Sequence, residues 1–288
     1  MKVVLFCGGQ GTRLRDHSEV IPKPLVGIGA RPVLWHLMRY YAHFGHRDFI
    51  LCLGHRGDLI REFFLNYNEA MSNDFVLSDG GKRIELLSSD LDEWRITFVD
   101  TGLHSSVGER LMRVREHVAG EEAFLANYSD GLTDLPLNRY IAEFERRGVV
   151  ASLLAVPPNL SFHAVKGDGE GLVRGFGTMQ EDGYLINGGF FCFRPEVFDY
   201  IKDGEDLNAQ PMQRLIAARQ LALYPYRGFW KPMDTFKDKM EFDAMEARGD
   251  SPWKVWKSDS ERATRRSRRV RVAALDEVRA PHSRAATP

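Results

Sequence analysis

The chain has 288 residues, which is long enough for one large or two small domains with a substantial hydrophobic core. Its 43% hydrophobic and 27% charged residues are typical of a soluble globular protein, and a net charge of −1 gives no reason to expect nucleic acid or a membrane as partner. Its apolar runs stay below the roughly 18 residues that a membrane helix needs, and its start has a strand pattern in place of a signal peptide.

The first predicted element is a short buried strand over Val3 to Phe6, which leads into a glycine-rich loop. The glycines of this loop are Gly8, Gly9 and Gly11. Because they carry no side chains, their backbone N–H groups can close on phosphate oxygens. Arg13 adds a planar fork of donors, and Lys23 adds a point charge. The spacing fits neither the Walker pattern nor the dinucleotide fingerprint, so an ordinary strand-to-helix turn would also explain the loop taken alone.

Helices and apolar strands alternate after this loop. Residues 32–44 and 58–70 have helical spacing, and residues 48–54 form a second buried strand. Such alternation is typical of a parallel sheet with a helix layer on each side. The sequence therefore predicts an α/β fold, with a mostly parallel mixed sheet and helices on both faces. A weaker pattern predicts a turn at Gly80-Gly81 and a strand over 83–87.

A carboxylate follows a strand in the middle of the chain. Strands are predicted over 94–100 and 123–128, with a basic amphipathic helix over 108–118 between them. The second strand ends in Ser129-Asp130-Gly131, at the position where open α/β sheets place their ligands. A turn residue before glycine would look the same, and without the opening motif that interpretation is the stronger one.

The last third continues with a helix over 137–147, a strand over 149–156, a hairpin over 162–173, a strand over 185–194, a helix over 211–220 and a strand over 221–230. Gly188 and Gly189 lie inside one of these strands, which indicates a bulge or a close approach by a ligand. Asp234 precedes a final helix that runs to residue 248, so an N-cap role is its simplest explanation.

The composition changes after residue 256. Residues 257–288 contain eight Arg and one Lys against two Asp and two Glu, with few large apolar side chains. We therefore expect one domain over residues 1–256 and a basic, mostly disordered tail over 257–288. The cysteines Cys7, Cys52 and Cys192 each lie in an apolar run, which predicts buried thiols and a cytoplasmic location.

Several motifs together resemble one family. Gly8-Gly9-Gln10-Gly11-Thr12-Arg13-Leu14 followed by Pro22-Lys23-Pro24 resembles the signature of the sugar-1-phosphate nucleotidyltransferases. The segments closest to its glucose-1-phosphate cytidylyltransferase branch are Trp35-His36, 99–102, 186–191 and 228–235. The resemblance covers residues 1–256. It implies a Rossmann-like core, a homo-oligomer, and transfer of a cytidylyl group from CTP to glucose 1-phosphate with release of pyrophosphate.

The same resemblance implies a role for each matching residue. Arg13 would bind the leaving pyrophosphate, and Lys23 would neutralise the α-phosphate in the transition state. Asp130 and Asp234 would hold Mg²⁺, for which two carboxylates with phosphate oxygens and waters are a normal ligand set. The implied nucleotide-binding residues are Gly8, Gly9, Gly11, Thr12, Arg13 and Arg110, and the implied sugar-phosphate residues are Asn187 and Gly188.

Three segments depart from the family pattern, and the smallest change is at the strand end where the family's Tyr-Gly-Asp-Gly reads Tyr128-Ser129-Asp130-Gly131. The family has Phe-x-Glu-Lys-Pro where this chain reads 176–180 as Phe-Gly-Thr-Met-Gln, so the lysine that grips the sugar phosphate is missing. Arg174 is the predicted substitute and Lys166 a second candidate, because Arg174 and Phe176 share a face of an extended segment. The family's Thr-Gly-Gly-Arg reads Val-Gly-Glu-Arg here, with a carboxylate at Glu109. The chain thus fits a working nucleotidyltransferase or a catalytically weak, nucleotide-binding relative that acts as a regulatory or assembly partner.

Overall fold

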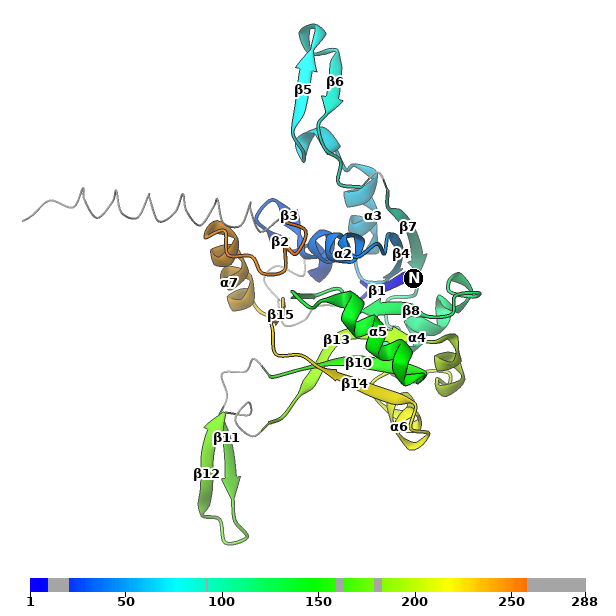
Figure 1. Cartoon of the computed structure of the whole chain (residues 1–288), viewed down its shortest axis with the longest axis vertical. Coiled ribbons are helices and arrows are strands. Elements are labelled where there is room, and N and C mark those ends of the chain that lie inside the picture. Colours follow the sequence, from blue (N-terminus) through cyan, green and yellow to red (C-terminus); the bar gives the residue numbers. More distant parts are fainter. Residues whose placement is uncertain (10–20, 92, 159–162, 179–182, 258–288) are drawn as a thin grey trace, which may run out of the picture.

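The computed structural model describes residues 1–9, 21–91, 93–158, 163–178 and 183–257 (Figure 1). Seven strands form one central sheet in the order β14-β10-β13-β8-β1-β4-β7. They are β1 (Val3–Phe6), β4 (Asp48–Leu53), β7 (Arg95–Asp100), β8 (Phe124–Asn127), β10 (Ala151–Val156), β13 (Ile186–Phe193) and β14 (Leu221–Pro225). β13 runs antiparallel to β8 and β10, and the other neighbours pair in parallel. The sheet is mixed and mostly parallel, as predicted.

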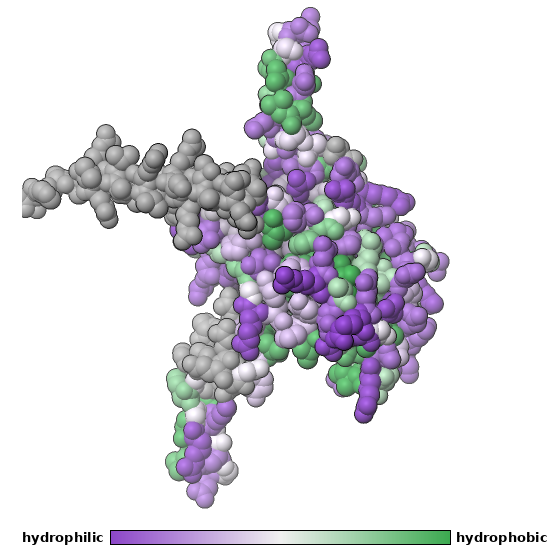
Figure 2. Space-filling view, viewed as in Figure 1, coloured by the Kyte–Doolittle hydropathy of each residue, from purple (hydrophilic) through white to green (hydrophobic). Residues whose placement is uncertain are grey.

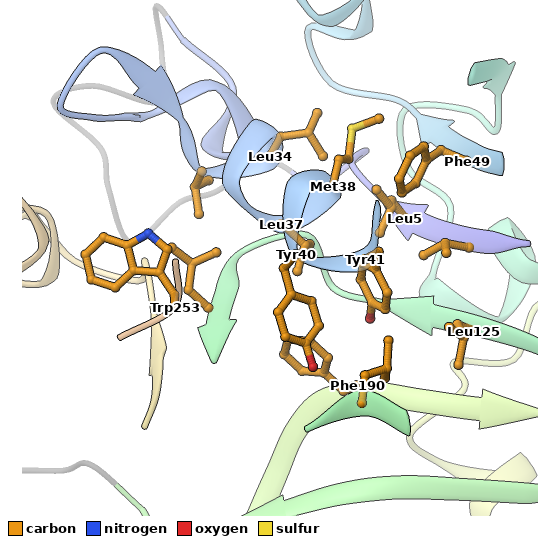
Figure 3. Close-up of a cluster of buried hydrophobic side chains, with 14 of the residues drawn as sticks. Leu5, Leu34, Leu37, Met38, Tyr40, Tyr41, Phe49, Leu125, Phe190 and Trp253 are labelled. Atoms are coloured by element: carbon orange, nitrogen blue, oxygen red, sulfur yellow. The ribbon is translucent and has the colours of Figure 1, made fainter. Parts of the chain in front are cut away.

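Helices cover both faces of this sheet, because alternate residues of each strand point to opposite sides. In β1, Val3 and Leu5 belong to one buried cluster, and Val4 and Phe6 belong to a second. The first cluster contains residues of α2 (Val33–His43), α3 (Gly57–Leu65), α5 (Leu137–Arg147) and α7 (Phe236–Ala247), and the second contains residues of α4 (Val107–Arg113) and α6 (Gln210–Ala217). Figure 3 shows the first cluster, in which Phe190 of β13 contacts the tyrosine rings of α2. The predicted two-layer helix cover is confirmed.

Three helices end at least three residues earlier than predicted, and one of them, expected over 211–220, ends at Ala217 as α6. The helix expected over 58–70 ends at Leu65 as α3, because the Asn68 side chain accepts a hydrogen bond from the N–H of Ala70 and begins a separate turn. The helix expected over 108–118 ends at Arg113 as α4. The short 3-10 segments are η2 (Lys23–Leu25), η3 (Glu69–Met71), η4 (Asp79–Gly81), η5 (Arg115–His117) and η6 (Pro195–Tyr200). None of the helices in the described residues is both long and apolar enough to cross a membrane.

Two small ribbons lie beside the central sheet. β2 (Gly27–Ile28) pairs with β3 (Arg31–Pro32), and β9 (Gly131–Thr133) pairs with β15 (Trp230–Pro232). The prediction of one strand over 221–230 is therefore wrong, since β14 ends at Pro225 and β15 begins at Trp230. Between them the Asp134 carboxylate accepts hydrogen bonds from the Tyr226 hydroxyl and the Phe229 N–H, which draws the chain out of the main sheet.

Two hairpins project from the body on opposite sides (Figure 1). The first is formed by β5 (Phe75–Ser78) and β6 (Arg83–Leu86), and the second by β11 (His163–Gly167) and β12 (Val173–Thr178). The turn and second strand of the first hairpin were expected, whereas the second hairpin was expected over 162–173 and its strand β12 instead runs to Thr178. Figure 2 shows apolar residues on each of them, and the basic tail after residue 257 lies outside the described residues.

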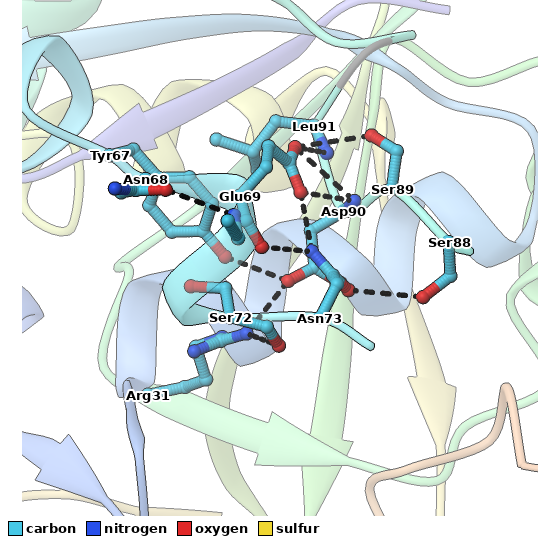
Figure 4. A network of polar contacts seen from close by, with 11 residues as sticks. Arg31, Tyr67, Asn68, Glu69, Ser72, Asn73, Ser88, Ser89, Asp90 and Leu91 are labelled. Atoms are coloured by element: carbon cyan, nitrogen blue, oxygen red, sulfur yellow. Dashed lines mark hydrogen bonds and ion pairs between the residues drawn. The ribbon is translucent and has the colours of Figure 1, made fainter. Parts of the chain in front are cut away.

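A polar network holds the base of the first hairpin against the body (Figure 4). The Arg31 guanidinium donates to Asp90 Oδ2 at 2.8 Å and to the carbonyl of Ser72 at 2.6 Å. The Tyr67 hydroxyl donates to the same Asp90 oxygen at 2.7 Å. Glu69 accepts the backbone N–H of Asp90 at 3.0 Å, so the two ends of the hairpin segment are tied together and to β3.

Candidate active site

Three charged side chains that are far apart in the sequence meet beyond the carboxyl end of β8. Lys23 Nζ lies 2.6 Å from Asp130 Oδ2 and also forms an ion pair with Asp234 Oδ1. The Lys23 side chain is 16% exposed, so this cluster is mostly shielded from water. The structure thus brings together the predicted catalytic lysine and both predicted metal ligands.

The β9–β15 ribbon explains why the two aspartates converge. Gly131 pairs with Pro232, and the N–H of Met233 donates to the carbonyl of Asp130 at 2.8 Å. Asp130 therefore directly precedes one strand of this ribbon, and Asp234 follows the other strand by two residues. This position lies at the edge where open α/β sheets place their ligands.

Asp234 is not the N-cap of α7, contrary to its simplest explanation from the sequence. The cap is Thr235, whose hydroxyl accepts the N–H of Asp238 at 3.2 Å. The Asp238 carboxylate in turn accepts the N–H of Thr235 at 2.8 Å, which completes a capping box. The Asp234 carboxylate therefore does not cap α7, and it forms its ion pair with Lys23.

The electrostatics of the cluster favour a cation between the two carboxylates. Burial lowers the pKa of Lys23, but the charges of Asp130 and Asp234 outweigh this and raise its pKa above the usual value. Two carboxylates that converge on one ammonium group are hard oxygen donors already placed around a positive charge. This donor set fits Mg²⁺, which binds through one or two carboxylates together with phosphate oxygens and waters.

Arg110 packs against the buried side of the glycine loop that follows β1. Its side chain is buried, at 4% exposure, and donates to Thr101 Oγ1 at 2.7 Å. It also donates to the carbonyls of Leu53, Gly102 and Gly8, at 3.1, 2.9 and 3.0 Å. One guanidinium group thus joins the chain segments that follow β1, β4 and β7. A Cβ at Gly8 would lie 2.1 Å from Arg110 Nη1, so this glycine is needed for packing as well as for any phosphate contact.

Gly9 of the same loop is exposed, and an added Cβ there would meet no atom within 4 Å. In the described residues there is therefore open space next to the Gly9 backbone. The other predicted loop residues, Gly11, Thr12 and Arg13, lie outside the described residues.

Glu109, which departs from the family pattern, is used within its own helix. Its carboxylate accepts the N–H of Ser106 at 2.7 Å, and the Ser106 hydroxyl accepts the N–H of Glu109 at 3.2 Å. The backbone hydrogen bond from Ser106 lowers the pKa of Glu109. The extra carboxylate therefore forms a capping box for α4.

Ser129 holds Asp130 in place through an unusual backbone conformation. Its φ is +63°, in the left-handed region that favours glycine. The Ser129 hydroxyl donates to the carbonyl of Phe6 at 2.8 Å, and its N–H donates to Asn127 Oδ1 at 2.7 Å. These bonds tie the end of β8 to the end of β1 and set the direction in which Asp130 leaves the sheet.

The predicted sugar-side residues lie beside this cluster. The carbonyl of Gly188 accepts a hydrogen bond from Trp230 Nε1 at 2.8 Å, which links β13 to the ribbon that carries the aspartates. Asn187 donates to the Tyr128 hydroxyl at 3.1 Å and to Asn208 Oδ1 at 3.3 Å. The sequence predicted no site role for Tyr128 or Asn208; the place of Tyr128 at a strand end is a signal for such a role, whereas Asn208 lies in no motif.

Arg174, the predicted substitute cation, is not brought to this cluster. It lies on β12 in the projecting hairpin and forms an ion pair with Asp168 at 2.7 Å. Its side chain is 68% exposed. Lys166 lies on the partner strand of the same hairpin, opposite Gly175.

The family described as nucleotidyl transferase matches residues 2–244 of this chain. The chain belongs to the nucleotidyl transferase family. Glucose-1-phosphate cytidylyltransferase from Salmonella typhi is 40% identical over 258 residues, which cover 89% of this chain and all of that protein. A Bacillus subtilis protein described as a probable glucose-1-phosphate cytidylyltransferase is 36% identical over the same shares of both chains. This nucleotidyl transferase therefore covers the full length of both relatives.

Solved structures support the fold of this nucleotidyl transferase. UDP-glucose pyrophosphorylase complexed with UDP-glucose has a TM-score of 0.62 at 16% identity, covering 86% of this chain and 98% of the other. HddC from Yersinia pseudotuberculosis has a TM-score of 0.60 at 17% identity, covering 85% and 99%. Both confirm a Rossmann-like core of the expected class.

Proposed function

We propose that this nucleotidyl transferase transfers a cytidylyl group from CTP to glucose 1-phosphate, releasing pyrophosphate and forming CDP-glucose. The observation that carries the proposal is the convergence of Lys23, Asp130 and Asp234, each at the position that the family motif requires. The 40% identity to a cytidylyltransferase along nearly the whole chain supports the choice of substrates.

The chemistry needs positioning and charge neutralisation more than a covalent partner. An oxygen of the sugar phosphate attacks the α-phosphorus of the nucleotide, a bond to pyrophosphate breaks, and all the groups involved are anionic. In this proposal Lys23 moves from the carboxylates to the α-phosphate, where it offsets the charge that develops in the transition state. Asp130 and Asp234 would hold Mg²⁺, which supplies further charge neutralisation when bound.

The remaining roles follow the arrangement of the site. The amides of Gly8, Gly9 and Gly11 with Thr12 would hold the nucleotide, and Arg13 would bind the pyrophosphate. Arg110 donates to the carbonyl of Gly8, so we propose that it supports nucleotide binding by fixing the loop that follows β1. Asn187 and Gly188 would line the sugar pocket.

Pyrophosphate release tests the proposal directly. The purified chain with Mg²⁺, CTP and glucose 1-phosphate should release pyrophosphate and form CDP-glucose, and UTP, GTP or dTTP should be poorer donors. Other sugar 1-phosphates in the same assay would show whether the sugar preference differs. CTP binding without turnover for any sugar would instead support the catalytically weak relative.

The missing family lysine needs its own test. Arg174 stays the candidate to bind the sugar phosphate because a guanidinium fork suits phosphate, although it pairs with Asp168 on the projecting hairpin and would have to leave that pair. Arg174→Ala should raise KM for glucose 1-phosphate, with Arg139→Ala on the exposed side of α5 as the control. If both variants have the wild-type KM, Arg174 is a surface charge.

We also propose that the chain forms a homo-oligomer in the cytoplasm. Exposed apolar residues of the first hairpin are Phe75, Val76, Leu77, Ile84 and Leu86. A two-stranded hairpin exposed on both faces is marginal in water, and apolar patches of this kind mark interfaces. Leu77→Glu should therefore lower the mass measured by light scattering. The control is Leu223→Glu on β14, where the leucine is similarly exposed, at 52% against 58%.

A further inference from the structure

A chain of hydrogen bonds runs from the backbone of β13 to the side chain of Asn208. The N–H of Gly189 donates to Asn187 Oδ1 at 2.9 Å, so the Asn187 amide must present its nitrogen on the other side. That nitrogen donates to the Tyr128 hydroxyl at 3.1 Å, and the hydroxyl donates to Asn208 Oδ1 at 2.7 Å. Each member fixes the next, so the direction of the whole chain is determined by a backbone N–H.

Asn208 is the open end of this chain. Its Oδ1 accepts from both Tyr128 and Asn187, which turns its Nδ2 and the two N–H groups away from them. Asn208 is exposed, and in the part of the chain that the structure describes this nitrogen has no hydrogen-bond partner. Because the bonds to its oxygen already orient the amide, its two N–H donors lose little conformational entropy when they bind a ligand.

The loop that carries Asn208 is fastened on its other side. The N–H of Asn208 donates to Asp206 Oδ1 at 2.9 Å, and the N–H of Val107 donates to Asp206 Oδ2 at 3.3 Å. The Ser106 hydroxyl donates to the carbonyl of Glu205 at 2.9 Å. Residues 205–208 are therefore anchored to the start of α4, and Asn208 is fixed at both its backbone and its side chain.

The free amide lies on the sugar side of the candidate site. Tyr128 precedes Asp130 by two residues, and Asn187 directly precedes Gly188. The carbonyl of Gly188 is bonded to Trp230 of the ribbon that holds the aspartates. Burial raises the pKa of Tyr128 to about 12, so its hydroxyl keeps the proton that it donates to Asn208.

We propose that Asn208 is a specificity-determining residue that donates a hydrogen bond from Nδ2 to a hydroxyl oxygen of the bound sugar 1-phosphate. This inference rests on the proposed function, and it adds a direct sugar contact that no sequence motif contains. A donor built to meet a hydroxyl rejects a deoxy sugar, because the amide then stays unpaired in the closed complex. The substrate is therefore a sugar 1-phosphate that keeps a hydroxyl at the contacted position.

Asn208→Asp distinguishes a hydrogen bond from Asn208 to the sugar from a role of Asn208 in orienting Tyr128. The carboxylate still accepts from Tyr128 and Asn187, but it offers an acceptor where the wild type offers two donors. We expect KM for glucose 1-phosphate to rise about tenfold or more, with KM for CTP and the melting temperature unchanged. Ala209→Asp is the matched control, because it adds the same charge one residue away at an exposed position outside the hydrogen-bond chain.

A panel of monodeoxy glucose 1-phosphates completes the test. In the wild type, kcat/KM should be lower for the analogue that lacks the contacted hydroxyl than for glucose 1-phosphate. In Asn208→Ala this difference should disappear for that analogue and persist for the others. The inference is overturned if Asn208→Ala changes all positions equally, or if Ala209→Asp raises KM as much as Asn208→Asp. If the wild type turns over and the Asn208 variants keep the wild-type KM for glucose 1-phosphate, this inference alone is refuted. If the wild type releases no pyrophosphate with any sugar 1-phosphate, the proposed function is refuted and this inference falls with it.

Discussion

Lys23 donates to Asp130 at 2.6 Å, so the ammonium group that should act on phosphate is held by a predicted metal ligand. Asp234 holds the same ammonium from the other side. The two carboxylates would repel each other without a cation between them. Lys23 therefore acts as an internal counter-ion, and in the proposed function it would move from carboxylate to phosphate.

Lys23→Met should lower turnover far more than nucleotide affinity. The methionine keeps most of the side-chain volume but removes the charge that offsets the developing transition state. We expect kcat to fall on the order of 10²-fold or more, with a much smaller change in the Kd for CTP. Steady-state kinetics together with calorimetric CTP binding measures both. A variant with wild-type kcat would give Lys23 a structural role only.

The same variant should bind a divalent ion more tightly in the absence of nucleotide. Removing Lys23 removes the competing cation and leaves two carboxylates for the metal. Mn²⁺ titration followed by electron paramagnetic resonance should show a lower Kd for Lys23→Met and a higher Kd for Asp234→Asn. Asp243→Asn is a suitable control, since this aspartate pairs with Lys239 on the exposed side of α7. Equal Mn²⁺ affinity in Asp234→Asn and wild type would remove Asp234 from the metal site.

Arg110→Met should affect both stability and nucleotide binding. The substitution removes one donor from the carbonyls of Gly8, Leu53 and Gly102, and we expect a loss of about 1–3 kcal/mol in the free energy of unfolding, because Gly8 and Leu53 keep backbone N–H donors. CTP affinity should fall because the loop after β1 loses its support. Urea unfolding and CTP titration test this, with exposed Arg139→Met as control. An unchanged CTP affinity in a folded variant would show that the loop does not depend on Arg110.

Ser129 offers a test of backbone strain next to Asp130. Ser129→Ala keeps the unfavourable φ of +63° and loses the hydrogen bond to Phe6, so it should cost about 1–2 kcal/mol. Ser129→Gly loses the same bond but relieves about 1 kcal/mol of strain, and should be near neutral. Chemical denaturation of the two variants compares them directly. A glycine variant no more stable than the alanine variant would mean that this φ carries little strain.

The sequence predicted the sheet and its helix layers because strands that are covered on both faces are continuous apolar runs, as in Val3 to Phe6, whose side chains divide between two buried clusters. It could not predict roles that depend on where distant segments meet. The family motif assigned Arg110 to nucleotide binding, and its bonds to Gly8, Leu53 and Gly102 gave no signal in the sequence because these residues lie in three separate segments. Asp234 looked like an N-cap because Thr235 and Asp238 fill that role one residue later. Asn208 gave no signal, since its partners are 80 and 21 residues away.

His36 should make the stability of the fold sensitive to acid. This side chain is 2% exposed on α2, with Nε2 at 3.2 Å from the carbonyl of Ile28 and Nδ1 at 3.4 Å from Nε1 of Trp253. Both bonds form together only if Nε2 carries the proton and Nδ1 accepts, so the ring is neutral. Burial lowers the pKa of His36 from 6.5 to about 4. A proton on Nδ1 would break the bond that ties Trp253 to α2.

Stability should therefore fall as the pH is lowered from about 6.5 to about 4. In this window the unfolded histidine binds a proton that the folded one does not, and the loss should approach about 3 kcal/mol. His36→Gln should flatten the dependence of unfolding free energy on pH, whatever its effect at pH 7. His46, whose pKa burial also lowers to about 4, should keep part of the slope. Exposed His104→Gln is the control, and a His36→Gln slope equal to that of His104→Gln would refute the assignment.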